Sequence, residues 1–183
     1  IPSYKMPNIK NASGYYTKKD MDLVDLFIGS EGPLGIVTEI QLKLMPRQKH
    51  LCAMTIFIQD EKKALEFIQM IREQPHKPVA IEYFDIDSLE FLKKQQRVNP
   101  AFSGLLKIPP GSYAAVYIEY HGKKSENIKK LLQAGKIFVF CGGKEEDTWL
   151  ALDDKGLEQL RIFRHAVPEA VNFMIDETRK RDK

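Results

Sequence analysis

The spacing of hydrophobic positions changes along this chain, and each change predicts a different element. After Asp20, a residue suited to cap a helix, apolar residues recur at helical spacing as far as residue 28, which predicts a helix. After a glycine-rich turn, residues 36–44 alternate between apolar and polar side chains, which predicts a strand. Pro46 ends this pattern and a polar run follows, so we expect a domain boundary between residues 1–47 and 48–183.

Beyond this boundary the pattern predicts strands that alternate with helices. Strands are expected at 51–58, 79–84, 113–120 and 136–141, and helices at 60–74, from about residue 87, and from Ser125 onward. Two successive strand–helix–strand units are typical of a ferredoxin-like split βαβ sandwich, here with one inserted helix after the second strand.

The last part of the chain, residues 144–183, is amphipathic and predicts helices. One of these is expected to begin near Pro168, because proline is tolerated in the first turn of a helix. The predicted fold class is therefore α+β. An antiparallel sheet with helices packed on it forms residues 48–183, and a short helix–turn–strand piece forms residues 1–47.

Composition and charge narrow the classes of function. Hydrophobic residues make up 43% and charged residues 29% of the 183 positions, which is typical of a folded globular protein. A net charge of +3 without a clustered basic patch speaks against nucleic-acid binding. No apolar run approaches the roughly 20 residues that a transmembrane helix needs. The two distant cysteines favour buried thiols in a reducing compartment, so we expect a cytoplasmic protein and leave peripheral membrane attachment of a longer parent open.

The turn from Gly29 to Gly35 is the first candidate binding site. Three glycines in seven positions let the backbone approach a ligand closely, and exposed N–H groups in such a turn suit a phosphate or pyrophosphate. The alternative is a plain chain reversal. A Rossmann fingerprint is excluded, because that motif follows a strand and opens a helix, which is the reverse of the order here.

Three strings of residues resemble the end of the PCMH-type FAD-binding domain of the vanillyl-alcohol-oxidase family, in particular its glycolate oxidase D-subunit and D-lactate dehydrogenase branch. They are Lys10-Asn11-Ala12-Ser13-Gly14-Tyr15, Asp25-Leu26-Phe27-Ile28-Gly29-Ser30-Glu31-Gly32 and Leu34-Gly35-Ile36-Val37-Thr38-Glu39. The resemblance implies that backbone in this turn lines FAD, at positions Gly29, Ser30, Glu31, Gly32, Leu34, Gly35 and Ile36. Pro33 stands where the family often has threonine, and it has no N–H to donate.

The resemblance continues in residues 80–85 and 161–170, which look like the C-terminal cap domain of the same family. It implies that Arg164 binds the carboxylate of the substrate, a role that suits the planar, permanently charged guanidinium. The alternative is a surface arginine paired with a nearby acid. Relatives also use a hydroxyl at the position of Pro168, which proline cannot supply. We predict no catalytic residue and no metal ligand in this chain, and we interpret its four histidines as solvated or capping residues.

These features together predict a fragment of an FAD-dependent enzyme that oxidises a 2-hydroxy acid, such as glycolate or D-lactate, to the 2-oxo acid. The start at Ile1-Pro2 agrees with an excised piece. Since the family's pyrophosphate loop and catalytic base fall outside the chain, we expect the fragment alone to be inactive and to retain little FAD. The electron acceptor is not specified, and a homodimer is compatible with the sequence. Two alternatives stay open: a stand-alone ferredoxin-like ligand-binding or regulatory module, and a non-oxidising FAD-dependent transferase of the same family.

Overall fold

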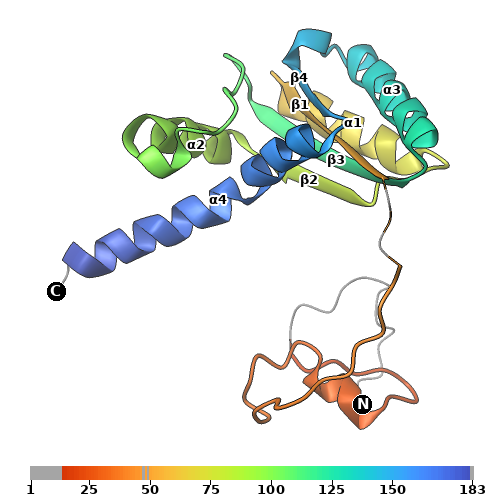
Figure 1. Ribbon diagram of the computed structural model, residues 1–183, viewed down its shortest axis with the longest axis vertical. Helices are drawn as coiled ribbons and strands as arrows, with labels where there is room; N and C mark the ends of the chain where they lie inside the picture. Colours follow the sequence, from red (N-terminus) through yellow and green to blue (C-terminus); the bar gives the residue numbers. More distant parts are fainter. Residues whose placement is uncertain (1–13, 47, 49, 182–183) are drawn as a thin grey trace. The chain divides into compact units, whose positions relative to one another are not determined.

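The structure, a computed structural model, describes residues 14–46, 48 and 50–181 (Figure 1). The chain divides into two compact units, Ile1–Pro46 and Arg47–Lys183, and each is described by itself.

Among the described residues of the first unit, 14–46, there is one short helical element, the 3-10 helix η1 (Leu23–Phe27). Its N-cap is Asp22, whose side chain accepts a hydrogen bond from the N–H of Val24 at 3.3 Å. The predicted cap at Asp20 is therefore wrong. Asp20 has a φ of 54°, whereas Asp22 has the extended backbone that a capping residue needs.

The strand predicted for residues 36–44 is not formed, which corrects the helix–turn–strand prediction for this unit. Its apolar side chains are exposed to solvent, with 94% of Ile36 and 83% of Leu44 accessible. A strand needs a neighbouring strand for its backbone hydrogen bonds and a covered face for its apolar side chains. Among the residues that the structure describes, nothing supplies either, so alternation alone does not produce the strand.

The second unit is built on a four-stranded sheet in the order β2-β3-β1-β4, in which all neighbours are antiparallel. The strands joined by α1, β1 and β2, are therefore parallel to each other, with β3 between them. The strands joined by α3, β3 and β4, are likewise parallel, with β1 between them. The α+β class is confirmed. The strands are β1 (His50–Ile58), β2 (Ala80–Phe84), β3 (Ala114–Gly122) and β4 (Thr148–Ala151).

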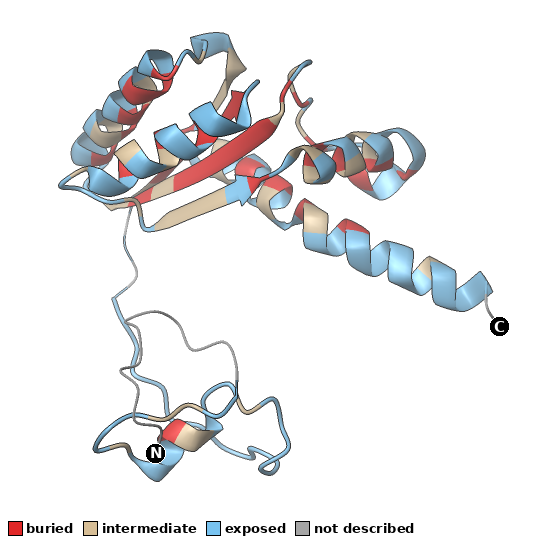
Figure 2. Ribbon diagram, turned by 180° about the vertical axis from the view of Figure 1, so that it is seen from behind, coloured by how far each residue is buried: buried red, intermediate tan, exposed pale blue. Residues whose placement is uncertain are grey.

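Helices cover both faces of this sheet, as Figure 2 shows by the buried strands between them. One core contains Met54 and Ile56 of β1 with residues of α1 and α3, and the other contains Ala53 and Phe57 with residues of α2 and α4. Successive side chains of β1 point to opposite faces of the sheet, and since both faces are covered by helices, β1 is buried almost throughout. None of the described helices is long and apolar enough to cross a membrane. The helices are α1 (Glu61–Glu73), α2 (Ile86–Val98), η2 (Pro100–Phe102), α3 (Lys124–Phe140), η3 (Glu145–Asp147) and α4 (Asp154–Arg181).

The strand predicted for residues 136–141 is wrong, because these residues form the end of α3. Ile137 and Phe138 are buried in the same core as Ala134, at helical spacing. Gly142 then adopts a φ of 83°, and the N–H groups of Gly142 and Gly143 donate to carbonyls of the last helical turn at 2.9 Å. This glycine-dependent C-cap explains where the helix ends. The fourth strand lies further on, in β4.

The helix start predicted near Pro168 is also wrong, because α4 runs without interruption through this residue. Proline has no N–H, so it gives no helical hydrogen bond to the carbonyl of Arg164, four residues earlier. The buried residues Phe163, Ala166 and Ala170 lie on both sides of the proline and hold this part of the helix on the sheet.

The start of α2 provides a prediction about pH. Asp85 caps this helix by accepting a hydrogen bond from the N–H of Ser88 at 2.8 Å. The Ser88 side chain and then its N–H hold the pKa of Asp85 below its ordinary value of 3.8. Since the folded pKa is depressed, this contribution to stability is complete above pH 3.8 and is lost as the pH falls through the folded pKa.

We expect Asp85→Ala to lower the free energy of unfolding at pH 7 by about 1 kcal/mol, since the cap is lost. Asp85→Asn keeps an oxygen that can cap the helix but cannot titrate. It should retain most of the stability at pH 7 and reduce the loss of stability as the pH falls below 3.8, measured by urea unfolding at several pH values. An unchanged acid profile in Asp85→Asn would contradict this assignment.

Candidate functional site

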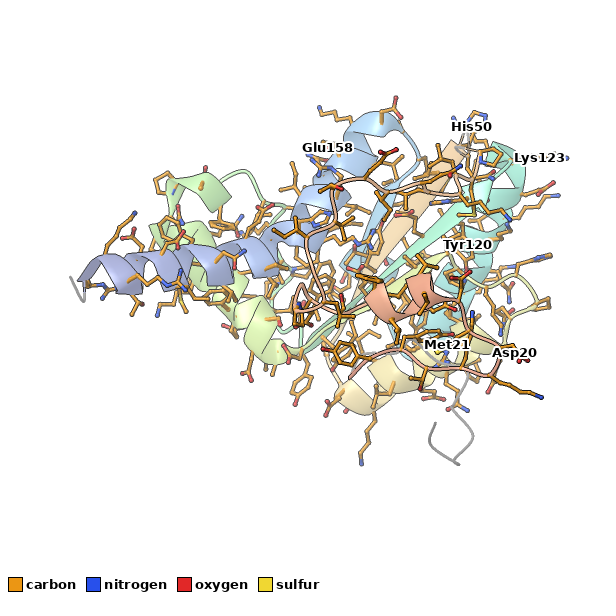
Figure 3. All side chains as sticks on the ribbon, turned by 90° about the horizontal axis from the view of Figure 1, so that it is seen from below. Asp20, Met21, His50, Tyr120, Lys123 and Glu158 are labelled. Carbon is orange, nitrogen blue, oxygen red and sulfur yellow. The ribbon has the colours of Figure 1, made fainter. Side chains whose placement is uncertain are left out.

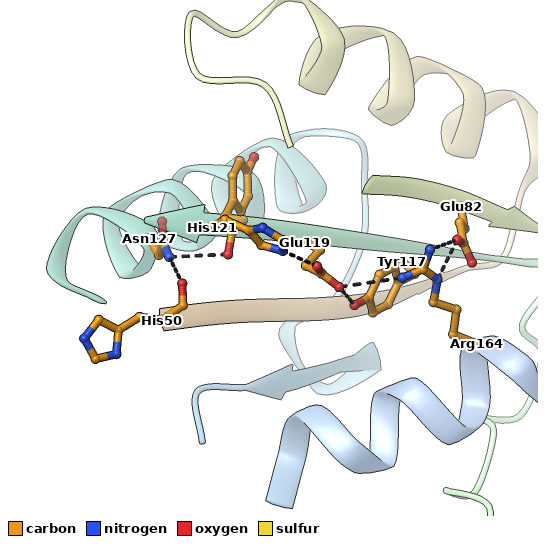
Figure 4. A network of polar contacts seen from close by, with 8 residues as sticks. His50, Glu82, Tyr117, Glu119, His121, Asn127 and Arg164 are labelled. Carbon is orange, nitrogen blue, oxygen red and sulfur yellow. Dashed lines mark hydrogen bonds and ion pairs between the residues drawn. The ribbon is translucent and has the colours of Figure 1, made fainter. Parts of the chain in front are cut away.

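Arg164 lies on α4, which packs on one face of the sheet, and residues from β2 and β3 surround its guanidinium group (Figure 4). Its Nε and Nη2 atoms are both 2.5 Å from the Oε1 atom of Glu82 on β2. The guanidinium carbon lies 5.4 Å from the centre of the Tyr117 ring, within the range of a cation–π contact. With 31% of its side chain accessible, Arg164 is held in place and is still open to solvent.

Three polar side chains follow one another on the face of β3 that lies toward Arg164: Tyr117, Glu119 and His121. The hydroxyl of Tyr117 donates to Oε2 of Glu119, and Nε2 of His121 lies in contact with Oε1 of the same carboxylate. The Nη1 atom of Arg164 is 3.8 Å from Oε2 of Glu119. This spacing is that of a loose ion pair, because it exceeds hydrogen-bond distance.

The pKa of Glu119 reflects these neighbours. Burial by itself would raise the pKa, but the hydrogen bonds from Tyr117 and His121 and the charge of Arg164 outweigh it, so the pKa lies below the ordinary value of 4.5. For Tyr117, burial and the neighbouring carboxylate raise the pKa of the phenol. At neutral pH the pair is therefore an ionised carboxylate with a neutral hydroxyl as donor.

A hollow of about 880 Å³ adjoins this cluster, between α4 and the sheet. His50 at the start of β1 and Glu158 on α4 are among the residues around it (Figure 3). Its wall carries charges of both signs, and Arg161 pairs there with Glu158 at 2.6 Å. The lining residues are Gln48, His50, Leu51, Tyr117, Glu119, Lys124, Leu152, Asp153, Asp154, Leu157, Glu158, Arg161, Arg164 and His165.

The structure thus places Arg164 on the wall of a hollow and, at the same time, in contact with an acid. Sequence reasoning named Arg164 but missed Glu82 and Glu119. The alternation of β3 was a usable signal, because its apolar residues fill one face and the polar residues at 117, 119 and 121 share the other. Glu82, 82 positions away from Arg164, had no comparable signal.

The glycine-rich turn of the first unit is accessible to solvent, with only Ser30 partly covered. Gly29, Glu31 and Gly32 have φ angles of 73°, 58° and 98°, the left-handed region that favours glycine. Ser30 donates its N–H to the carbonyl of Phe27 at the end of η1, and Gly35 donates its N–H to the carbonyl of Gly32 within the turn. Within the described part of the chain, the N–H groups of Glu31, Gly32 and Leu34 donate to no other group, so they are available to a ligand.

Asp25 organises the helix that leads into this turn. Its carboxylate accepts from the N–H of Asp22 at 2.9 Å and pairs with Nζ of Lys18 at 3.1 Å. The backbone hydrogen bond and then Lys18 hold its pKa below the ordinary value of 3.8. Asp25, which belongs to one of the strings that resemble the flavoprotein family, therefore stabilises local structure. Residues 10–13, which belong to another of the three strings, lie outside the described part of the chain.

Comparison with known proteins gives three informative relatives, and no family model matches the chain. D-lactate dehydrogenase of Anaerostipes hadrus is 32% identical over 140 residues, which cover 73% of this chain and 26% of the relative. The glycolate oxidase subunit GlcD of Bacillus subtilis is 23% identical over 168 residues, covering 88% of this chain and 33% of the relative. An uncharacterised FAD-linked oxidoreductase of Mycobacterium tuberculosis is 30% identical over 98 residues, covering 54% of this chain and 21% of the relative.

This chain is a relative of FAD-linked oxidoreductases. The resemblance inferred from its strings of residues is confirmed, and the alignment with GlcD extends over most of the chain. The chain spans only 26% to 33% of the length of the first two relatives. Among residues 14–46, 48 and 50–181, no group of three or more histidine, cysteine, aspartate or glutamate side chains is arranged to hold a metal ion.

Proposed function

We propose that this chain is part of an FAD-dependent oxidoreductase that converts a small 2-hydroxy acid, of the glycolate or D-lactate type, into the 2-oxo acid. The support comes from two relatives whose names specify lactate and glycolate, together with a fixed arginine on the wall of a hollow. Arg164 carries this proposal, because a guanidinium held by Glu82 and lying over the Tyr117 ring presents a permanent positive charge to a carboxylate.

The two units take different roles in this proposal. Residues 1–47 are the last part of the FAD-binding domain, and residues 48–183 are the domain that covers the substrate. Two interleaved strand–helix–strand units, with α1 and α3 on one face of the sheet, support a ferredoxin-like classification of the second unit. In this scheme α2 is an insertion that covers the opposite face together with α4.

The first unit has features that suit FAD. Its turn is accessible, and three N–H groups, at Glu31, Gly32 and Leu34, are available to polar atoms of the cofactor. Gly29, Ser30, Gly35 and Ile36 complete the proposed lining, and Pro33 contributes no donor. FAD held by these residues would supply the acceptor for the hydride of the substrate's α-carbon. The chain's own task is to orient the acid, since Arg164 fixes the carboxylate and thereby the α-carbon.

The decisive experiment uses the longer protein that carries this sequence. We expect it to purify with FAD and to lose its flavin absorbance anaerobically when glycolate or D-lactate is added, while the 183-residue chain purifies without stoichiometric flavin. Ultraviolet–visible spectra measure both. A longer protein whose flavin is not reduced by any 2-hydroxy acid would refute the proposed reaction. If the 183-residue chain purifies with stoichiometric flavin, the expected dependence of FAD binding on further flavin-binding parts is refuted.

A further inference from the structure

We propose that Glu119 determines specificity by accepting a hydrogen bond from the hydroxyl group beside the ligand's carboxylate. This inference rests on the proposed function, because it assumes that a carboxylate binds to Arg164. It adds a second contact in the same hollow and explains which small acids the site prefers.

The geometry around Arg164 leaves one end of its guanidinium group for a ligand. Glu82 takes the edge formed by Nε and Nη2, and Glu82 is not part of the wall of the hollow. Nη1 points instead toward Glu119, which does line the hollow, at 3.8 Å (Figure 4). A donor and an acceptor at this spacing do not satisfy each other by a hydrogen bond, so each can bind a different group of one small molecule.

Glu119 is prepared to accept a hydrogen bond. The Tyr117 hydroxyl and the His121 ring each contact one of its two oxygens, and with Arg164 nearby they favour the ionised form. An ionised carboxylate has about four lone-pair positions, so capacity remains for a further donor. It has no proton to donate, which means that a ligand must bring its own donor to this position.

A 2-hydroxy acid matches this pair of groups. Only one carbon separates its carboxylate from its hydroxyl, so the carboxylate can accept from Nη1 of Arg164 while the hydroxyl donates to Glu119. An acid without this hydroxyl, or the 2-oxo acid formed by oxidation, brings no donor and leaves the carboxylate of Glu119 unmatched. Sites that hydrogen-bond a substrate hydroxyl reject analogues without it far more strongly than an apolar pocket does.

The negative charge of Glu119 also repels every carboxylate ligand, and this effect must be separated from the hydrogen bond. Glycolate and acetate carry the same charge on the same group and differ by the one hydroxyl. The ratio of their dissociation constants therefore cancels the repulsion and reports the hydroxyl contact alone.

The experiment titrates the isotopically labelled 183-residue chain with glycolate and with acetate, followed by the NMR signals of residues around the hollow, including the ring signals of Tyr117 and His121. We expect glycolate to bind about tenfold more tightly than acetate, as a hydrogen bond to a charged group implies. In Glu119→Ala the ratio should fall toward one, while acetate binds at least as well as before. Glu119→Gln retains an acceptor oxygen and should keep part of the preference. Arg164→Met should weaken both acids together.

The outcomes separate this inference from the proposed function. An unchanged glycolate-to-acetate ratio in folded Glu119→Ala and Glu119→Gln overturns the role of Glu119 and leaves Arg164 as the carboxylate site. Equal binding of both acids by the original chain overturns it as well. If neither acid binds, or if Arg164→Met binds both undiminished, the proposed carboxylate site on Arg164 is wrong and the present inference falls with it. Amide spectra that match the original chain outside the hollow show that each variant is folded.

Discussion

Replacing Arg164 by methionine in the longer flavin-containing protein should lower kcat/KM for its 2-hydroxy acid by about a hundredfold. The change removes the charged hydrogen bond to the carboxylate, worth about 1.5–3 kcal/mol, and with it the group that orients the α-carbon. It also leaves Glu82 without its partner, although both side chains are about one-third accessible, so water can solvate the remaining charge. Steady-state kinetics and the rate of flavin reduction by substrate would measure the effect.

Arg72→Met is a matched control for this substitution. Arg72 is an exposed arginine in the last turn of α1, and it does not line the hollow. We expect its kcat/KM to stay within twofold of the original protein. If the two variants lose activity equally, or if Arg164→Met retains full activity, Arg164 is a surface ion-pair residue and does not bind substrate.

Replacing Phe163 by alanine should lower the free energy of unfolding of the chain by about 3–5 kcal/mol. Phe163 is fully buried, and its ring packs edge-on against Trp149 at 5.1 Å and lies 5.0 Å from the Phe84 ring. Truncation leaves a cavity and removes ring contacts with three strands, since Phe163 also lies 6.1 Å from the Phe57 ring of β1. Because Phe163 precedes Arg164, its packing also fixes the part of α4 that carries the proposed carboxylate site. Urea unfolding followed by circular dichroism would measure the loss.

Phe173→Ala makes the same chemical change further along the same helix. Phe173 is 43% accessible, so its truncation creates no comparable cavity, and we expect a change of less than about 1 kcal/mol. Equal losses in the two variants would show that helix stability in general, and not the aromatic core around Phe163, holds α4 on the sheet.

Much of the second unit could be predicted from local pattern. The strands β1 and β3 and the helix α1 lie within two residues of their predicted limits, because their periodicity is long and regular. The error at residues 136–141 has a clear origin, since a short apolar run is compatible with a strand or with a buried helical turn. The helix forms here because its buried face continues from Ala134 and because Gly142 provides a C-cap after its last turn.

By itself, the sequence determined the relationship to FAD-linked oxidoreductases, the α+β class and the identity of Arg164 as a candidate. These depend on local strings and on periodicity, which neighbouring residues encode. Only the tertiary structure decided which groups surround that arginine, because β2, β3 and α4 bring Glu82 and Glu119 to it from distant parts of the chain. It also decided against the strand at 36–44, since a strand depends on the hydrogen bonds of a partner strand, which local alternation does not encode.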